Sequence, residues 1–358
     1  MNKLKLFNNL PIASAIMFFL VSGVFAQAFP NQSESVSAAT RKELIDALLQ
    51  KLNALYVFPE AAKNAETLIR ERAAKKEYDQ IANGADLGRK LTEDLQGVTR
   101  DKHLRVLFNP QGFPKREEGA PGEKEFEEIR QQGRISNFGF ERVERLQGNV
   151  GYLDVRRFFF ADMSGDTIAA AMNFLANTDA LIVDLRNHRG GEPETVALFD
   201  SYFFSEPTEV NAVYWRPTNT TQQFWTSPHV AGKRYLNKPV YILTSGITFS
   251  GAEAFAYDLK AYKRATLIGE QTRGGAHPAP VYPLTTYFAA QIPIGKAVNP
   301  VTKTNWEGIG IEPDVKVPAE QALKTAHVTA LKEIMNRQQN PEVKTQLNNL
   351  IEKLQKGQ

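Results

Sequence analysis

The stretch Tyr241-Ile-Leu-Thr-Ser-Gly-Ile-Thr-Phe-Ser250-Gly-Ala-Glu-Ala-Phe-Ala-Tyr-Asp-Leu259 decides the fold, because it predicts a strand, a tight turn and a helix in succession. Ser250 falls at the predicted start of the helix, where free N–H groups and the helix dipole can hold a developing oxyanion. The position suits a plain N-cap serine equally well, since Glu253 three residues later completes a capping box. These residues alone leave both interpretations open, a helix cap and a nucleophile.

Strands alternate with helices from Phe138 onward. The predicted strands are 150–155, 180–185, 240–243 and 265–269, the predicted helices are 162–177, 193–203 and one that begins at Ser250, and residues 286–294 alternate as in a hairpin. This order predicts an α/β fold with a mixed, mostly parallel sheet and crossover helices. Functional loops are expected at the carboxyl ends of its strands.

The 358 residues are too many for one minimal domain. Helical periodicity over 38–98 and a short strand at 104–108 predict a small N-terminal helical domain over 38–108. A linker rich in glycine, proline and charge is expected at 109–134, the α/β domain at 135–318, and a helical tail at 319–358.

The N-terminus has the pattern of a secretory signal peptide. Lys3 and Lys5 precede an apolar run at 12–25, and Val24-Phe25-Ala26 predicts cleavage after Ala26, so that 1–26 form the signal peptide. A retained membrane anchor is the alternative. The chain has no cysteine, which excludes disulfides, thiolate nucleophiles and cysteine zinc sites. We therefore expect a bacterial periplasmic or secreted protein without a membrane segment after cleavage.

Charge gives little indication of a partner. The net charge is +3 and basic residues are interspersed with acidic ones. Nucleic acid is not an expected partner, because no basic stripe runs along the chain.

Three further loops carry residues suited to chemistry. Asp184-Leu-Arg-Asn-His-Arg-Gly190-Gly191 places a glycine pair after a buried strand, Gly269-Glu-Gln-Thr-Arg-Gly-Gly-Ala276-His277 follows another, and Asn305-Trp-Glu307-Gly-Ile-Gly310-Ile-Glu-Pro-Asp314 sets a carboxylate among glycines. Glycine allows backbone N–H groups to approach a ligand closely, although each loop alone is also compatible with a plain turn.

The ordered set of motifs resembles the tail-specific (C-terminal processing) serine peptidase family, in the branch of the tricorn core and interphotoreceptor retinoid-binding protein. Residues 135–318 carry the resemblance most strongly. It implies a crotonase/ClpP-like ββα-spiral catalytic domain, with Ser250 as nucleophile. The N–H of Gly251 and one from the Gly190-Gly191 loop are then implied as the oxyanion hole.

The base departs from the common family pattern. Many members use a lysine in the loop that corresponds to 269–277, but Gly275 stands at that position here. The resemblance to the tricorn-like branch implies instead a histidine and a glutamate, for which the chain offers His103 and Glu307. His277 is the main rival as base.

Two further residues have open roles. His188 is a second rival as base, and Glu253 is a possible supporting residue. Without the resemblance, a turn histidine before a strand is the plainer interpretation of His103.

We therefore expect an exported serine peptidase that hydrolyses peptides or unfolded proteins through an acyl-enzyme, with no cofactor and no metal. The interval 109–137 is too short for the PDZ domain that many relatives carry there. The alternative is a non-catalytic or weakly catalytic carrier of apolar ligands, with a pocket lined by the aromatic runs Phe158-Phe159-Phe160 and Tyr202-Phe203-Phe204. The sequence leaves the oligomeric state open.

Overall fold

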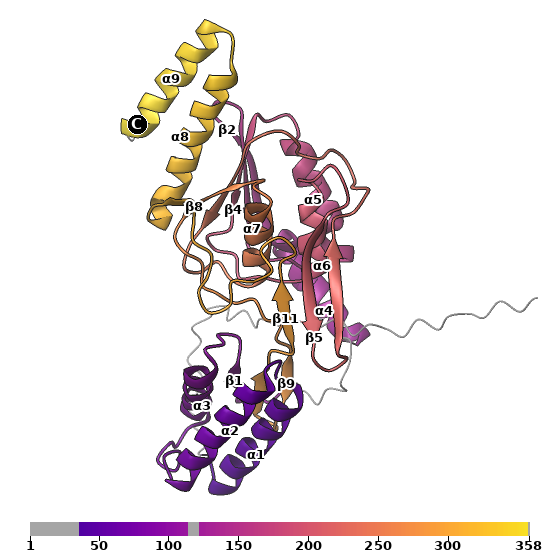
Figure 1. The fold of residues 1–358 in the computed structure, drawn as a ribbon, viewed down its shortest axis with the longest axis vertical. Coiled ribbons are helices and arrows are strands. Elements are labelled where there is room, and N and C mark those ends of the chain that lie inside the picture. The colour runs from indigo at the N-terminus through magenta and orange to yellow at the C-terminus, as the bar shows by residue number, and fades with distance from the viewer. Residues whose placement is uncertain (1–35, 114–121, 357–358) are drawn as a thin grey trace, which may run out of the picture.

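The computed structural model describes residues 36–113 and 122–356, and its central element is a six-stranded sheet (Figure 1). The strand order is β12-β8-β7-β4-β3-β2, with β2 antiparallel to β3 and the other neighbours parallel. The strands are β2 (Phe140–Leu146), β3 (Val150–Val155), β4 (Ala180–Asp184), β7 (Val240–Thr244), β8 (Thr266–Gly269) and β12 (Val315–Lys316). The expected mixed, mostly parallel sheet is confirmed.

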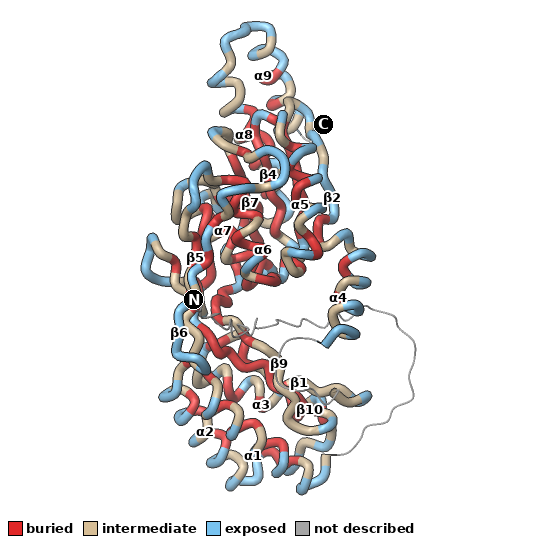
Figure 2. The backbone as a smooth tube through the Cα atoms, turned by 90° about the vertical axis from the view of Figure 1, so that its right-hand side faces the viewer, coloured by how far each residue is buried: buried red, intermediate tan, exposed pale blue. Residues whose placement is uncertain are grey.

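Helices cover both faces of this sheet, which explains why β3, β4 and β7 are buried along their whole length. Leu181 and Val183 pack on one face with Phe255 of α7, while Ile182 and Leu243 pack on the other with α8 and α9. Figure 2 shows the buried tube concentrated along β4 and β7. The helices are α5 (Ala161–Leu175), α6 (Pro193–Asp200), α7 (Gly251–Ala261), α8 (Ala319–Arg337) and α9 (Pro341–Lys356).

The N-terminal region is helical, as expected, but it is completed by strands from much later in the chain. Its helices are α1 (Ala38–Leu55), α2 (Pro59–Ala74) and α3 (Gly84–Thr99), and its sheet is β1 (Arg105–Phe108), β10 (Phe288–Gln291) and β9 (Val281–Pro283). Val106 pairs with Ala290, and both lie in one apolar core with the helices. The N-terminal region and the α/β region are therefore interlocked through a shared sheet.

A third sheet was not expected from the sequence. It consists of β5 (Glu209–Trp215), β6 (Thr220–Trp225) and β11 (Gly295–Val298) in the order β11-β5-β6. We assigned no element to residues 204–239, because β6 is largely polar and β5 does not alternate strictly between buried and exposed positions. β2 was missed for the same reason, since four of its seven residues are exposed and successive charges hide its pattern.

The remaining described elements are short. Helix α4 (Glu123–Ile135) lies within the predicted linker at 109–134, and the 3-10 helix η1 (Asn137–Gly139) follows it. The predicted signal peptide at 1–26 lies outside the described residues, and the predicted domain limits remain predictions. Among the described residues, no helix has both the length and the apolarity needed to cross a bilayer.

Candidate active site

Ser250 lies at the turn between β7 and α7, in a backbone conformation that non-glycine residues rarely adopt. Its φ is 58° and its ψ is −122°, and such strain costs about 1–3 kcal/mol. The turn is held in place because Thr248 Oγ1 donates to the Leu185 carbonyl at 2.8 Å and the Phe249 N–H donates to the His188 carbonyl at 3.1 Å. In many hydrolases, a strained strand-to-helix turn of this kind carries the nucleophilic serine.

The glycine pair packs directly against this turn. A Cβ added to Gly190, whose φ is +106°, would lie 2.8 Å from Ser250 Cβ. The Gly190 N–H is engaged, because it donates to His188 Nδ1 at 3.0 Å. The N–H groups of Gly191 and Gly251 donate to no other described residue, and a Cβ on Gly251 would lie 3.0 Å from Gly191 N. Two unengaged amides therefore lie beside Ser250, as an oxyanion hole requires.

Glu253 connects the turn at Ser250 to the loop at 269–277. Its carboxyl group accepts hydrogen bonds from the Ser250 N–H at 2.8 Å, the Gly274 N–H at 2.7 Å, the Gly275 N–H at 2.9 Å and Thr272 Oγ1 at 2.5 Å. Burial raises the pKa of Glu253 to about 7, and these hydrogen bonds only partly oppose that rise. Glu253 thus holds the loop against the serine turn.

His103 lies between α3 and β1 and is only 1% exposed. Its backbone N–H donates to Asp101 Oδ1 at 3.0 Å, and its ring packs on Phe249 with centroids 4.5 Å apart. Neither ring nitrogen has a hydrogen-bond partner among the described residues. Burial lowers the pKa of His103 to about 3, so the imidazole is neutral at physiological pH, and its protonation requires a nearby carboxylate to stabilise the imidazolium.

Glu307 lies beside this histidine. Its Oε2 accepts from the N–H groups of Ala276 at 2.5 Å and His277 at 3.2 Å, and lies 4.0 Å from His103 Nδ1. That distance is longer than a hydrogen bond, but catalytic hydrogen bonds are often loose before substrate binds. Burial, with the charge of Asp101 adding to it, raises the pKa of Glu307 to about 7.

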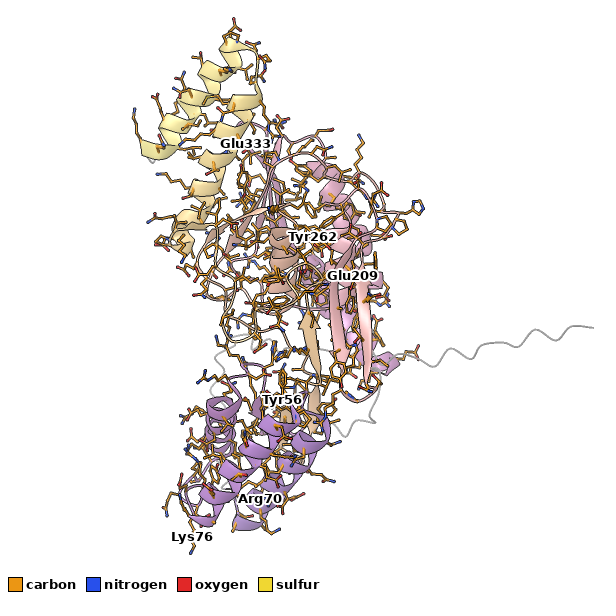
Figure 3. All side chains as sticks on the ribbon, viewed as in Figure 1. Tyr56, Arg70, Lys76, Glu209, Tyr262 and Glu333 are labelled. Carbon is orange, nitrogen blue, oxygen red and sulfur yellow. The ribbon has the colours of Figure 1, made fainter. Side chains whose placement is uncertain are left out.

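His277 belongs to the same cluster but faces the N-terminal region. Its Nδ1 lies 2.9 Å from Asp101 Oδ2 and 3.4 Å from Glu307 Oε2. Tyr56 OH donates to Asp101 Oδ2 at 3.2 Å, and Figure 3 shows Tyr56 at the end of the N-terminal helices nearest the α/β region. Burial pushes the pKa of Asp101 upward, but the hydrogen bond and charge of His277 outweigh it and lower that pKa. This ring is therefore tied to Asp101, whereas the ring nitrogens of His103 are not.

Asp101, His277 and Glu307 also have ligand atoms that are close enough together to bind one metal ion. The ligand atoms of Asp101, His277 and Glu307 lie within 4.8 Å of one another. They are already hydrogen-bonded to each other, to Tyr56 or to backbone N–H groups. The contacts of this cluster are thus explained without an ion, and we infer no metal site.

A narrow cavity of about 50 Å³ opens beside Ser250. Its walls are mainly apolar and come from α6, α7 and the third sheet, with Val196, Val213 and Phe224 among them. A cavity next to two free amides and a strained serine can receive a side chain of a bound molecule.

Five of the sequence-predicted residues meet at one point, namely Ser250, Gly251, Gly190, Gly191 and Glu253. The other predicted group, His103, Glu307 and His277, forms the adjoining cluster. Gly275 lies between the two groups. Its N–H donates to Glu253, and a Cβ added to Gly275 would lie 2.6 Å from His103 Cε1.

His188 serves the glycine loop. It is fully buried against Phe158, with ring centroids 4.4 Å apart, and accepts from the Gly190 N–H. Burial lowers the pKa of His188 to about 3. Sequence reasoning did not single out Thr272, Asp101 or Tyr56, whose roles depend on contacts between segments far apart in the chain.

Two protein-family models match the chain. Residues 149–317 match the model of peptidase family S41, and residues 36–132 match the N-terminal domain of Peptidase S41 in eukaryotic IRBP. The resemblance that the motifs implied is thereby confirmed, including the N-terminal domain of its retinoid-binding branch.

Two curated relatives and one solved structure extend the comparison. A carboxy-terminal-processing protease from Bartonella bacilliformis is 28% identical over 194 residues, which cover 52% of this chain and 43% of the relative. The carboxyl-terminal-processing peptidase 1, chloroplastic, of Arabidopsis thaliana is 26% identical over 191 residues, covering 52% and 38%. The chain thus matches less than half the length of either relative.

The fold itself is shared with a lipoprotein from Streptococcus agalactiae, at a TM-score of 0.54 and 14% identity, over 86% of this chain and 99% of that one.

Proposed function

The chain carries a peptidase family S41 domain, and from this premise we propose that it is a serine peptidase with Ser250 as nucleophile, His103 as base and Glu307 as the carboxylate behind the base. The observation that carries the proposal is the strained Ser250 turn, which lies beside the free N–H groups of Gly191 and Gly251. A helix cap alone requires neither the strain nor the two amides.

The proposed reaction begins when Ser250 Oγ attacks the carbonyl carbon of a peptide bond and its proton passes to the ring of His103. The oxyanion is held by the N–H groups of Gly191 and Gly251, while Glu307 stabilises the imidazolium. The C–N bond then breaks and the proton moves from His103 to the departing amine. Water, deprotonated by the same ring, hydrolyses the acyl-enzyme and restores the serine.

His103 is preferred to His277 as base for two reasons. Its ring contacts Phe249, the residue directly before Ser250, and both of its nitrogens are without hydrogen-bond partners in the described chain. His277 is tied to Asp101 and packs on Phe58, with ring centroids 5.2 Å apart.

The size of the cavity argues against a carrier of large apolar ligands. At about 50 Å³ it has room for only roughly four water molecules, which suits a single side chain but not a large apolar ligand. We further propose that the substrates are peptides or unfolded proteins, and that the protein acts outside the cytoplasm after removal of residues 1–26. That part of the proposal depends on the apolar N-terminal run.

Covalent labelling tests the nucleophile. A fluorophosphonate probe should label the wild-type protein, and the Ser250→Ala variant should show no labelling above background and lose peptide hydrolysis. Equal labelling of the two proteins would overturn the proposal. Matching circular dichroism spectra are the control for folding.

A further inference from the structure

The cavity beside Ser250 extends along two neighbouring helices towards a pair of buried acids. Gly251, Ala254 and Asp258 of α7 line it at intervals of three and four residues, which places them along one side of that helix. Pro193 and Ala197 line it from α6 in the same manner. The cavity is therefore lined both by the proposed nucleophile and by Asp258.

The next turn of α6 places a second carboxyl group beside the first. Asp200 follows Ala197 by three residues on α6, and the charge of Asp258 adds to the burial that raises the pKa of Asp200. Both aspartates are fully buried. Asp258 thus lines the cavity, and Asp200 lies behind it as a second acid from a second helix.

These carboxyl groups lack the partners that buried acids normally have. Both oxygens of Asp200 and Oδ2 of Asp258 have no hydrogen-bond partner within the described residues, and neither side chain forms an ion pair there. Asn299 Nδ2 donates to Asp258 Oδ1 at 2.9 Å. An unpartnered buried acceptor is costly, and residues that serve packing alone avoid that cost.

The unmet acceptors lie at a distance from Ser250 that one extended side chain can span. Eight residues of α-helix from Ser250 to Asp258 cover about 12 Å. Helical side chains point back towards the N-terminus, so the carboxyl group of Asp258 shortens this distance, as does the reach of the serine hydroxyl. The distance that is left between the serine hydroxyl and the Asp258 carboxyl group suits an unbranched side chain that ends in a cation. The four-carbon stem and ammonium group of lysine are such a side chain.

From this arrangement, which rests on the proposed peptidase function, we propose that the cavity is the pocket for the residue preceding the scissile bond and that Asp258 and Asp200 select a basic residue there, lysine above all. The narrow apolar walls accommodate the methylene stem, and the acid pair accepts hydrogen bonds from the ammonium group. A buried site that provides unmet acceptors discriminates strongly against an analogue without the donor.

The test compares two fluorogenic peptides that differ only before the scissile bond, where one carries lysine and the other norleucine. Norleucine has the same stem without the amine. Wild-type kcat/KM should favour lysine by at least ~10-fold. In Asp258→Asn this ratio should fall to within about threefold, and Asp200→Asn should lower it in the same direction. The exposed carboxylate of Asp166 provides the matched control, since Asp166→Asn should leave the ratio unchanged.

The same experiments distinguish a failure of the pocket assignment from a failure of the peptidase proposal. If the wild-type protein is labelled by fluorophosphonate but cleaves the norleucine peptide as fast as the lysine peptide, the pocket assignment is wrong while the peptidase proposal stands. If neither labelling nor hydrolysis occurs, the peptidase proposal fails and the pocket assignment fails with it.

Discussion

Two groups of acidic residues lie near Ser250, and they differ in whether a basic side chain accompanies them. Asp101 and Glu307 lie against His277, whose ring nitrogen is within 3.4 Å of both carboxyl groups. Asp200 and Asp258 meet with no basic side chain beside them in the described chain, and burial raises the pKa of each well above its usual value. In the first group a histidine already lies against the carboxyl groups, whereas the second group has room for a cation from outside.

The strongest way to break the first group is to remove the proposed base, His103, whose ring lies 4.0 Å from Glu307 of this group. His103→Gln should lower kcat/KM for a peptide substrate by at least ~10³-fold, because the serine loses its proton acceptor. His327→Gln is the control, since this histidine lies on α8 and is bonded to the Gln147 carbonyl, away from the site. If His103→Gln retained more than a tenth of the activity, His277 would become the better candidate for the base.

A smaller loss is expected when the first group is displaced without removing any of its members. A Cβ at Gly275 would lie 2.2 Å from Phe249 Cε2 and 2.6 Å from His103 Cε1. We expect Gly275→Ala to lower kcat/KM by roughly 10²-fold, because a small misplacement of a catalytic group is enough. Gly97→Ala is the matched control, since a Cβ at Gly97 on α3 meets no atom within 4 Å. Full activity of Gly275→Ala would contradict the placement of the His103 ring.

The smallest expected effect concerns the second group, Asp200 and Asp258, and is a change in how the free energy of unfolding depends on pH. A carboxyl group with a raised pKa stabilises the folded state fully below its unfolded pKa, and this stability is lost as the pH rises towards the folded value. Asp200→Asn removes one such group, so its free energy of unfolding relative to wild type should be about 1 kcal/mol higher at pH 8 than at pH 5.

Urea unfolding at the two pH values measures this difference. Asp166→Asn, which alters an exposed acid, should show no such dependence on pH. An equal effect of Asp200→Asn at both pH values would indicate that Asp200 is not buried beside another acid.

The parts of the site that depend on local sequence were predictable. The strand, turn and helix around Ser250 follow from a short apolar run, a glycine and a serine before a periodic helix, and the glycine pair at 190–191 follows a buried strand. His103 could be proposed only from the family resemblance. Its approach to Phe249 depends on β1 pairing with β10, which lies far away in the chain.

The acid pair was not predicted, for a related reason. Asp200 and Asp258 each look like an ordinary polar residue of a helix, and only the packing of α6 against α7 brings them together. One signal was readable, because Asp258 lies on the same side of the helix as Ser250 and Ala254. The third sheet escaped prediction because a polar strand such as β6 gains its order from neighbours rather than from its own pattern.

The contact of Gly275 with His103 has a consequence for the kind of base that this chain can use. A lysine at this position, as in many members of the family, would require the space that the His103 ring and Phe249 occupy. In this chain, the present position of the His103 ring and a lysine at position 275 therefore exclude each other sterically.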